Sequence, residues 1–464
     1  MLTAGMVAGA TGGRLVAGSA DRVFDAVSTD SRSLAAGSLF IALRGDRFDG
    51  HAFVDRALDQ RAAGLLVSTL PSAPVLAGTE AAVILVDDTL EALQRLGRAV
   101  RRQSGARVVA ITGSAGKTTT KEVAAEFLSA RYRVFRNKGN LNNHIGLPLS
   151  LIELHRGPEV AVVELGMNHA GEIQTLVRLA EPDVRVWLNV GDAHIGHFES
   201  RDALARAKAE ILGDAAPSAL VVANADDAFV MGQMRAWTGR RVLFGEAAGA
   251  DVRARHVSDR GFGGTIADVD TPAGPLHLTV PLAGRAQLSN VLAAVAVALE
   301  FGIGRRDLET RAAALTAVAR RGEVTKLSSG IRLVDDSYNA SPAAVRAMLA
   351  ALAATPGAGR RVAVLGEMLE LGTSARALHE ACGRAAAEAG VDELIVIGGP
   401  AADGLVDGAV AGGLVRAHVH RFADSASAAA EVPRLVRAGD LVLVKGSRGT
   451  RTDLVADGLK QVAG

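Results

Sequence analysis

A pattern typical of phosphate binding lies between residues 107 and 121, where the chain reads RVVAITGSAGKTTTK. The apolar run 108–111 predicts a short buried strand, and the small residues after it allow a tight turn and a close approach to a ligand. Lys117 can place a cation beside a phosphate, and the Thr118 hydroxyl can ligate magnesium. The strict P-loop spacing requires a glycine at Ile111, so the pattern is a shortened variant. A plain glycine turn would not explain the Lys-Thr-Thr run, and we therefore interpret the segment as a nucleotide-binding loop.

Candidate magnesium ligands follow two further apolar runs. Glu164 ends the predicted strand 160–164, and His194 lies in the loop after the predicted strand 184–190. Ligands of parallel α/β sheets gather at the carboxyl ends of the strands, so a carboxylate there beside a P-loop is a natural magnesium ligand. Glu164 alone could also be a solvated strand end, and the neighbouring P-loop favours the metal role. A single histidine in such a loop, His194 or His197, is more often structural than catalytic.

Two other features need a structural context before they indicate chemistry. Four asparagines, Asn137, Asn140, Asn142 and Asn143, fall within seven residues. This density predicts a polar loop that hydrogen-bonds to a ligand rather than a helix or strand. Lys208 lies in a predicted helix, where its own chemistry indicates no more than a solvated side chain.

The alternation of predicted strands and helices along the chain predicts an α/β protein, and the length of 464 residues indicates three domains. We place the boundaries so that a small N-terminal α/β domain spans 1–87, a central P-loop domain 88–319 and a C-terminal Rossmann-like α/β domain 320–464. The central domain should have a largely parallel sheet, with predicted strands at 108–111, 160–164, 184–190 and 219–223. The C-terminal domain should be a small doubly wound sheet, with predicted strands at 331–336, 361–365, 394–397 and 441–444.

Composition narrows the classes of function. Lys and Arg number 51 against 50 Asp and Glu, so no net field favours nucleic acid or an anionic membrane. A single cysteine, Cys382, excludes an internal disulfide and fits a reducing compartment. The first residues have no basic region and too short an apolar run for a signal peptide, and no run approaches the ~20 residues of a membrane span. We expect a cytoplasmic protein.

A series of segments in a fixed order resembles the Mur ligases, the ATP-dependent amide-forming enzymes of peptidoglycan precursor synthesis. The segments are TDSR, FDGHAF, TGSAGKTTTK, NLNNHIGLP, VVELGMNHAGEI, NVGDAHIGHF, AKAEIL, DDSYNASP, LGEMLELG and LVKGSRG. They cover nearly the whole chain, and this ordered set is far more specific than any one motif. DDSYNASP with GEMLELG is similar to the branch that adds D-alanyl-D-alanine, whereas the DNPR element of the diaminopimelate-adding branch is missing.

The resemblance implies a role for each matching residue. It assigns the ATP phosphates to Gly113, Ser114, Ala115, Gly116, Lys117, Thr118 and Thr119. It implies further ATP contacts by Asn290 in the adenine-side helix, Arg321 at the phosphates and Asp336 at the ribose. It implies the magnesium ligands Thr118, Glu164, His194 and Lys208, the last as a carbamate, and the catalytic residues Lys117, His194 and Lys208. It implies that the first domain binds the UDP-sugar through Ser31 and Arg32. It also implies that Asn137, Asn140 and Asn143 contact the same substrate.

Two departures from the family pattern affect these expectations. The usual Gly-x-His-Asn at the start of the adenine-side helix is replaced by Ala286 and Gln287 in the last two positions. The glycine that usually precedes Arg321 is Arg320 here. The adenine contact is therefore the part of the nucleotide site that the resemblance leaves open.

The implied reaction is ATP-dependent ligation of D-alanyl-D-alanine to UDP-N-acetylmuramoyl-tripeptide through an acyl phosphate, with ATP and Mg²⁺ as cofactors. Its partners are these small molecules, with no nucleic acid and no membrane span, and we expect a monomer. Folylpolyglutamate synthase is a related alternative, against which the separate first 86 residues argue. A nucleotide-regulated binding protein without catalysis is another, and the presence of Lys117, Glu164, His194 and Lys208 argues against it.

Overall fold

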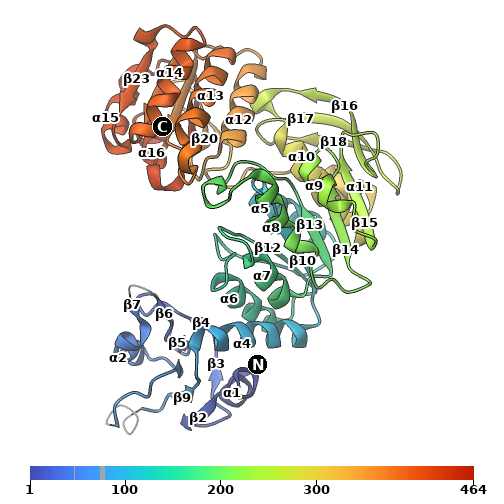
Figure 1. Ribbon diagram of the computed structural model, residues 1–464, viewed down its shortest axis with the longest axis vertical. Coiled ribbons are helices and arrows are strands. Elements are labelled where there is room, and N and C mark those ends of the chain that lie inside the picture. Colours follow the sequence, from blue (N-terminus) through green and yellow to red (C-terminus); the bar gives the residue numbers. More distant parts are fainter. Residues whose placement is uncertain (46–47, 74–78, 464) are drawn as a thin grey trace.

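The computed structural model describes residues 1–45, 48–73 and 79–463. Figure 1 shows three lobes that follow one another along the chain, each built around its own sheet. The lobes are mixed α/β units with mainly parallel sheets, which confirms the predicted fold class.

The N-terminal lobe contains a five-stranded sheet in which only the edge strand β2 is antiparallel to its neighbour. In spatial order the strands are β2 (Arg14–Ala17), β9 (Ala82–Leu85), β8 (Gly64–Val67), β5 (Leu39–Ile41) and β4 (Val27–Ser28). Its helices are α1 (Ala4–Thr11), η1 (Gly50–Phe53) and α2 (Val54–Asp59). Two short strand pairs complete it, β1 (Leu2–Thr3) with β3 (Val23–Phe24) and β6 (Arg44–Gly45) with β7 (Phe48–Asp49).

The central lobe has a nine-stranded sheet that is parallel from β11 to β16 and antiparallel from β16 to β18. In spatial order the strands are β11 (Val134–Arg136), β12 (Val160–Glu164), β10 (Arg107–Thr112), β13 (Val184–Trp187), β14 (Leu220–Asn224), β15 (Arg240–Gly245), β16 (Val252–Asp259), β17 (Thr265–Asp270) and β18 (Leu276–Val280). The helices of this part are α4 (Thr89–Ser104), α5 (Lys117–Leu128), α6 (Gly146–Ile152), α7 (Glu172–Ala180), α8 (Arg201–Ala209), α9 (Ala228–Met234), α10 (Ala286–Glu300) and α11 (Arg305–Ala313).

The C-terminal lobe has a six-stranded sheet, parallel except for β19 at one edge. In spatial order the strands are β19 (Glu323–Lys326), β20 (Arg332–Asp336), β24 (Leu441–Lys445), β21 (Arg361–Gly366), β22 (Glu393–Ile397) and β23 (Val419–Phe422). The helices are α12 (Pro342–Ala354), α13 (Ala375–Glu388), α14 (Asp403–Ala411), α15 (Ser425–Leu435) and α16 (Asp453–Ala463).

The buried strands explain why sequence patterns predicted the central and C-terminal sheets well. The strands β12, β13, β22 and β24 are buried along their whole length and read as continuous apolar runs with few interruptions. Helices cover both faces of such parallel sheets, so no polar face is needed. In contrast, residues 23–27 alternate with the period of a strand and predict a single one, but they divide between β3 and β4, which belong to different sheets.

No helix in the described part of the chain is both long and apolar enough to cross a membrane.

Helix α4 joins the first two lobes. It packs on α1 of the N-terminal lobe and on α6 and α7 of the central lobe (Figure 1). Apolar residues of both lobes form one continuous buried cluster around it, from Leu2 and Phe24 to Val108 and Val163. The two lobes are therefore held together by a shared core.

A glycine permits the close contact between α4 and α6. A Cβ at Gly97 would lie 2.9 Å from Cα and 3.0 Å from the carbonyl oxygen of Pro148. Both atoms belong to backbone, which cannot move aside like the tip of a side chain.

Replacement of Gly97 by alanine should therefore destabilise the protein, although alanine is the better helix former. Overpacking typically costs about 1–3 kcal/mol, against a gain of about 1 kcal/mol in helix propensity. The matched control is Gly232→Ala in α9, where nothing lies within 4 Å of the added Cβ and a small stabilisation is expected. Thermal or denaturant unfolding of both variants measures the difference, and a G97A variant as stable as G232A would contradict the packing argument.

Candidate active site

The phosphate-binding loop joins β10 to α5 at the carboxyl edge of the central sheet. Asn189 holds it by accepting a hydrogen bond from the Ala115 amide (2.9 Å) and donating one to the Ala115 carbonyl (3.1 Å). Gly116 is left-handed (φ 85°), and a Cβ there would collide with the side-chain oxygen of Asn290. Glycine is therefore required at this turn, and Asn290 packs directly against the loop.

The loop presents positive charge to an anion. Helix α5 begins at Lys117, so the unpaired amides of its first turn adjoin the loop. The Lys117 ammonium donates a hydrogen bond to the Gly113 carbonyl (2.6 Å). Desolvation lowers the pKa of Lys117, and the positive charge of Arg321 lowers it further while Glu164 opposes the shift. Cations this close together favour a polyanionic ligand such as the phosphate chain of a nucleotide.

Thr118 and Glu164, predicted separately as magnesium ligands, lie in direct contact. The Thr118 hydroxyl donates to Glu164 Oε2 (2.8 Å), and the Asn142 amide donates to Glu164 Oε1 (2.9 Å). Glu164 is 2% exposed. The contact follows from the parallel register of β10 and β12, which pairs Ile111 with Glu164 at the carboxyl ends of both strands.

The asparagine loop supports the carboxylate from within the protein. Asn137 is buried, accepts from the Glu164 backbone amide (3.1 Å) and donates to the Leu141 carbonyl (2.9 Å). Asn143 accepts from the Gly146 amide (2.8 Å) at the start of α6. Asn140 is exposed. Burial and two internal hydrogen bonds show that Asn137 holds this loop and strand in place, and its expected contact with the substrate stays a prediction.

His194 and Lys208 lie near Lys117. Burial lowers the pKa of His194, and the charges of Lys117 and Lys208 lower it further. The Lys208 side chain is 1% exposed, and desolvation followed by the charge of Lys117 places its pKa well below the usual value. Among the described residues, none forms a hydrogen bond or ion pair with the side-chain nitrogen of Lys208. Burial therefore favours the neutral amine at Lys208, in contrast to the solvated ammonium that its helical position indicates.

The C-terminal lobe brings a second set of charged groups to the same region. Asp336 pairs with Lys445 (2.6 Å), which also donates to the Asn339 carbonyl (2.9 Å). Burial raises the pKa of Asp336, and Lys445 opposes the shift. The Arg321 guanidinium stacks on the Tyr338 ring, 4.0 Å from its centroid. Arg321 and Asp336 thus lie on the side of the C-terminal lobe that faces the phosphate-binding loop.

Arg320, which replaces a usual glycine, keeps the left-handed backbone of that position (φ 60°). Its guanidinium pairs with Asp453 (2.6 Å) and Asp457 (2.9 Å) of α16. These ion pairs hold a conformation that is otherwise unfavourable for a residue with a side chain.

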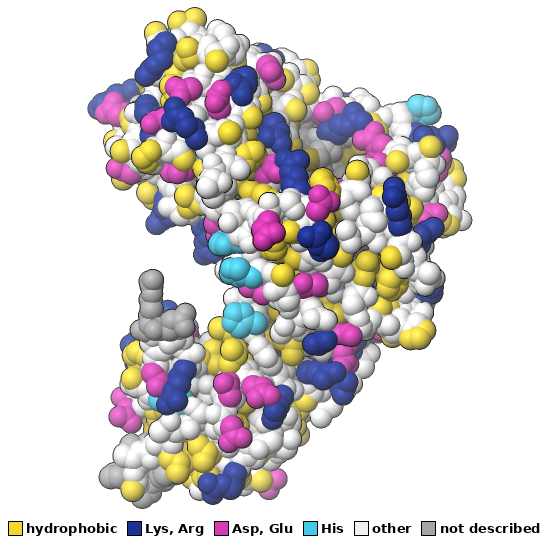
Figure 2. Space-filling model, viewed as in Figure 1, with side chains coloured by type: hydrophobic (Ala, Val, Ile, Leu, Met, Phe, Trp, Pro, Cys, Tyr) yellow, Lys and Arg dark blue, Asp and Glu magenta, His cyan; other side chains and the backbone are white. Residues whose placement is uncertain are grey.

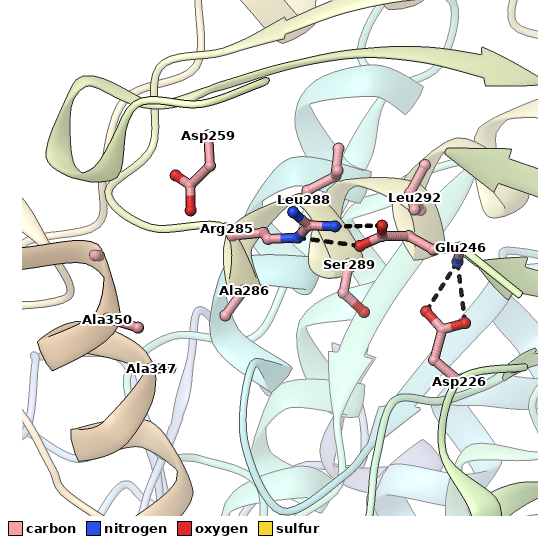
Figure 3. Close-up of a pocket in the computed structure, with 11 residues that line it drawn as sticks. Asp226, Glu246, Asp259, Arg285, Ala286, Leu288, Ser289, Leu292, Ala347 and Ala350 are labelled. Atoms are coloured by element: carbon pink, nitrogen blue, oxygen red, sulfur yellow. Dashed lines mark hydrogen bonds and ion pairs between the residues drawn. The ribbon is translucent and has the colours of Figure 1, made fainter. Parts of the chain in front are cut away.

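A cavity of about 320 Å³ lies between the start of α10 and α12 (Figure 3). Ala286 lines it, whereas Gln287 is turned toward the amide of Asn290 (2.9 Å). Arg285 forms an ion pair with Glu246 at its wall. The substitution of Ala286 for the usual histidine therefore leaves open space at the helix start.

The sequence-predicted residues of the N-terminal lobe lie apart from this cluster. Ser31 is buried, and Arg32 is exposed and paired with Asp30 (2.8 Å). Figure 2 shows a hollow between the N-terminal lobe and the rest of the molecule, with histidine side chains along its wall.

Sequence reasoning missed three residues that shape the site. Asn189 holds the phosphate-binding loop, Asn142 holds Glu164, and Glu370 lies 2.5 Å from His194. Asn189 lies near the end of the predicted strand 184–190, which is a weak signal by itself. Glu370 comes from another lobe, so only tertiary structure could pair it with His194.

Comparisons with known proteins cover nearly the whole chain. Family models described as Mur ligase family, catalytic domain, Mur ligase middle domain, and Mur ligase, glutamate ligase domain match residues 23–101, 111–298 and 320–448. A Bacillus subtilis protein named UDP-N-acetylmuramoyl-tripeptide–D-alanyl-D-alanine ligase is 34% identical, over 94% of this chain and 93% of its own. The structure of MurF from Acinetobacter baumannii has a TM-score of 0.87 at 31% identity, covering 99% of this chain and 98% of that one. MurF from Thermotoga maritima in complex with ADP has a TM-score of 0.81 at 29% identity, covering 94% and 97%.

Replacement of Lys117 by alanine should abolish turnover that depends on a nucleotide. The variant loses the side-chain cation closest to the loop, and one such electrostatic contact is typically worth ~10²-fold or more in rate. Steady-state release of the nucleoside diphosphate measures the effect. The control is Lys326→Ala on the exposed edge strand β19, which should keep normal turnover. Near-normal turnover by K117A would contradict the phosphate-binding role.

Proposed function

This chain belongs to the Mur ligase family, and from that premise we propose that it ligates D-alanyl-D-alanine to UDP-N-acetylmuramoyl-tripeptide, with ATP converted to ADP and phosphate, in peptidoglycan precursor synthesis. The observation that carries the proposal is the match, over almost the whole of both chains, to relatives that bear the name of this ligase. The phosphate-binding loop with Lys117 and the paired Thr118 and Glu164 supports the ATP-dependent step.

The reaction proceeds in two steps that make an unreactive carboxylate into an acylating agent. A carboxylate oxygen of the tripeptide attacks the γ-phosphorus of ATP, ADP leaves, and an acyl phosphate forms. The amine of the dipeptide then attacks the acyl carbon, loses a proton, and expels phosphate. Lys117 and Arg321 stabilise the charge that develops on the transferring phosphoryl group.

The residues present fit a magnesium ion at the phosphates. Mg²⁺ usually takes one or two carboxylates together with substrate phosphates and waters, and Thr118 beside Glu164 offers a hydroxyl and a carboxylate of this kind. No group of three His, Cys, Asp or Glu side chains in the described ranges could hold a metal by itself. We therefore propose that nucleotide oxygens and waters complete the shell. Bound there, magnesium supplies charge neutralisation for phosphoryl transfer.

We assign His194 and Lys208 to a second magnesium position. Lys208 is buried beside Lys117 with a strongly lowered pKa, so its neutral amine can react with carbon dioxide and lose a proton. The resulting carbamate is an anion, which offsets Lys117 and can ligate a divalent cation. An unmodified ammonium would repel the ion instead.

The remaining substrate contacts follow the division into lobes. We propose that the cavity beside Ala286 takes the adenine and that Asp336 holds the ribose. Ser31, Arg32 and Asn140 would meet the UDP-tripeptide from the N-terminal side.

We propose that the domains span 1–87, 88–319 and 320–464 and that the enzyme works as a cytoplasmic monomer. The three domains must then close on one another, because the three substrates have to be aligned and water has to be excluded from the acyl phosphate.

The carbamate assignment predicts chemical rescue. A Lys208→Ala variant should have low activity, and short carboxylates such as acetate should partly restore it by occupying the position of the carbamate. Lys326→Ala serves again as the control, because its activity should not respond to acetate. Activity is measured as ADP release over a range of acetate concentrations, and full activity of K208A without any additive would refute the assignment.

The substrate assignment predicts a strict requirement for three substrates. With ATP and UDP-N-acetylmuramoyl-tripeptide present, D-alanyl-D-alanine should be used far better than D-alanine, because binding of the second residue positions the first. ADP and phosphate should form, and AMP should not. Product mass and ADP release test this together. Glutamate-dependent turnover with a folate would favour a folylpolyglutamate synthase. An ADP release rate that does not depend on the dipeptide would refute the assignment.

A further inference from the structure

Two loops from different lobes meet at His194. The loop after β13 carries His194, and the loop after β21 carries Glu370. The carboxylate Oε2 of Glu370 lies 2.5 Å from Nδ1 of His194, and the backbone amide of Gly196 donates to the Glu370 carbonyl (3.0 Å). The contact therefore involves both side chains and backbone.

The approach of the two loops is built into the backbone. A Cβ at Gly196 would lie 2.7 Å from the Gly372 nitrogen and 2.8 Å from the Glu370 carbonyl oxygen, so glycine is needed there. His194 and Glu370 are both left-handed (φ 63° each), which is uncommon for residues with side chains. Two such residues facing each other indicate a specific arrangement rather than a chance surface ion pair.

Apolar packing fixes the same contact from both sides. Ile195, next to His194, packs against the core of the first two lobes and also against the core of the C-terminal lobe. Leu371, next to Glu370, is buried in the C-terminal core. Neither loop can move far without disturbing a core, so the positions of the imidazole and the carboxylate are coupled.

The geometry determines which ring nitrogen is free. An ionised carboxylate only accepts hydrogen bonds, so a neutral His194 that pairs with ionised Glu370 through Nδ1 carries its proton on that nitrogen. Nε2 then keeps its lone pair, which is the form of histidine that binds a metal. The other carboxylate oxygen of Glu370, Oε1, has no hydrogen-bond partner among the described side chains.

We propose that Glu370 is a positioning residue for His194: the C-terminal lobe fixes the tautomer and orientation of this imidazole and thereby completes the metal site of the central lobe. The inference rests on the proposed role of His194 as a magnesium ligand. Glu370 belongs to the segment 367–372 of the C-terminal lobe, and we propose that this segment contacts the incoming dipeptide. Docking of the lobe that carries the dipeptide would then set the geometry of the metal ligand.

The first test reads the imidazole directly, without metal and without turnover. Nitrogen-15 NMR of the histidine rings, with His194 assigned from a His194→Ala variant, should show the Nδ1–H tautomer in the unmodified protein. Glu370→Ala should shift His194 to a mixture of tautomers. The matched control is Glu380→Gln, which removes an exposed carboxylate of α13 paired with Arg384 and should leave the His194 signals unchanged.

The second test measures the metal. Mn²⁺ binding in the presence of a non-hydrolysable ATP analogue, followed by electron paramagnetic resonance, should weaken about tenfold or more in Glu370→Ala, as is typical when the partner of a ligating histidine is lost. Affinity for the analogue alone should stay unchanged, since the phosphate-binding loop is intact. Glu370→Gln keeps the size of the side chain and should retain more Mn²⁺ affinity than Glu370→Ala, because its amide oxygen can still accept from Nδ1–H.

The outcomes separate this inference from the role on which it rests. If His194→Ala leaves Mn²⁺ affinity unchanged, His194 is not a ligand and the proposed metal site fails. If His194→Ala weakens Mn²⁺ binding while Glu370→Ala changes neither the tautomer nor the affinity, Glu370 forms only a structural ion pair and the inference is overturned. Parallel losses in both variants, with a shifted tautomer in Glu370→Ala, support it.

Discussion

The hydrogen bond between Thr118 and Glu164 is the constraint on which the rest of the site depends. It exists because β10 and β12 lie side by side in parallel and end together, so that a helix start and a strand-end carboxylate meet. Asn142 donates a hydrogen bond to the other carboxylate oxygen, and Asn137 accepts one from the Glu164 backbone amide. A buried carboxylate with these partners is oriented before any ligand arrives, which is the condition for effective electrostatic catalysis.

Positive charge is concentrated around that carboxylate. Burial lowers the pKa values of Lys117, Lys208 and His194, and neighbouring cations among Lys117, Arg321 and Lys208 lower them further. Such a cluster is unfavourable in a protein without a ligand, because each buried cation must be compensated. Phosphates, and an anionic form of Lys208, would relieve it. The cluster of cations therefore favours binding of a polyanion and destabilises the protein when no ligand is bound.

The three lobes are connected in different ways. The first two share a continuous apolar core around α4, where Gly97 allows the helix to approach α6 closely. The central and C-terminal lobes meet through Phe262 and Ala283, which pack in the C-terminal apolar core, and through the loop at 192–197, where His194 contacts Glu370. The shared core around α4 lies on the side proposed for the UDP-sugar, and the contact of His194 with Glu370 lies at the proposed metal site. A change in the position of the C-terminal lobe would therefore alter the surroundings of His194.

The sequence alone determined the fold class, the strands of the two larger sheets and the phosphate-binding loop, because fully buried parallel strands and a glycine turn before Lys-Thr leave local patterns. Local patterns failed at 23–27, where an alternating run divides between two sheets, and they did not indicate that the polar side chain of Asn137 is buried. Tertiary structure alone decided the burial of Lys208, which lowers its pKa, and the pairings of Asn189 with Ala115 and of Glu370 with His194. The physical reason is that desolvation and hydrogen bonding depend on neighbours in space, and the neighbours of these residues come from distant parts of the chain.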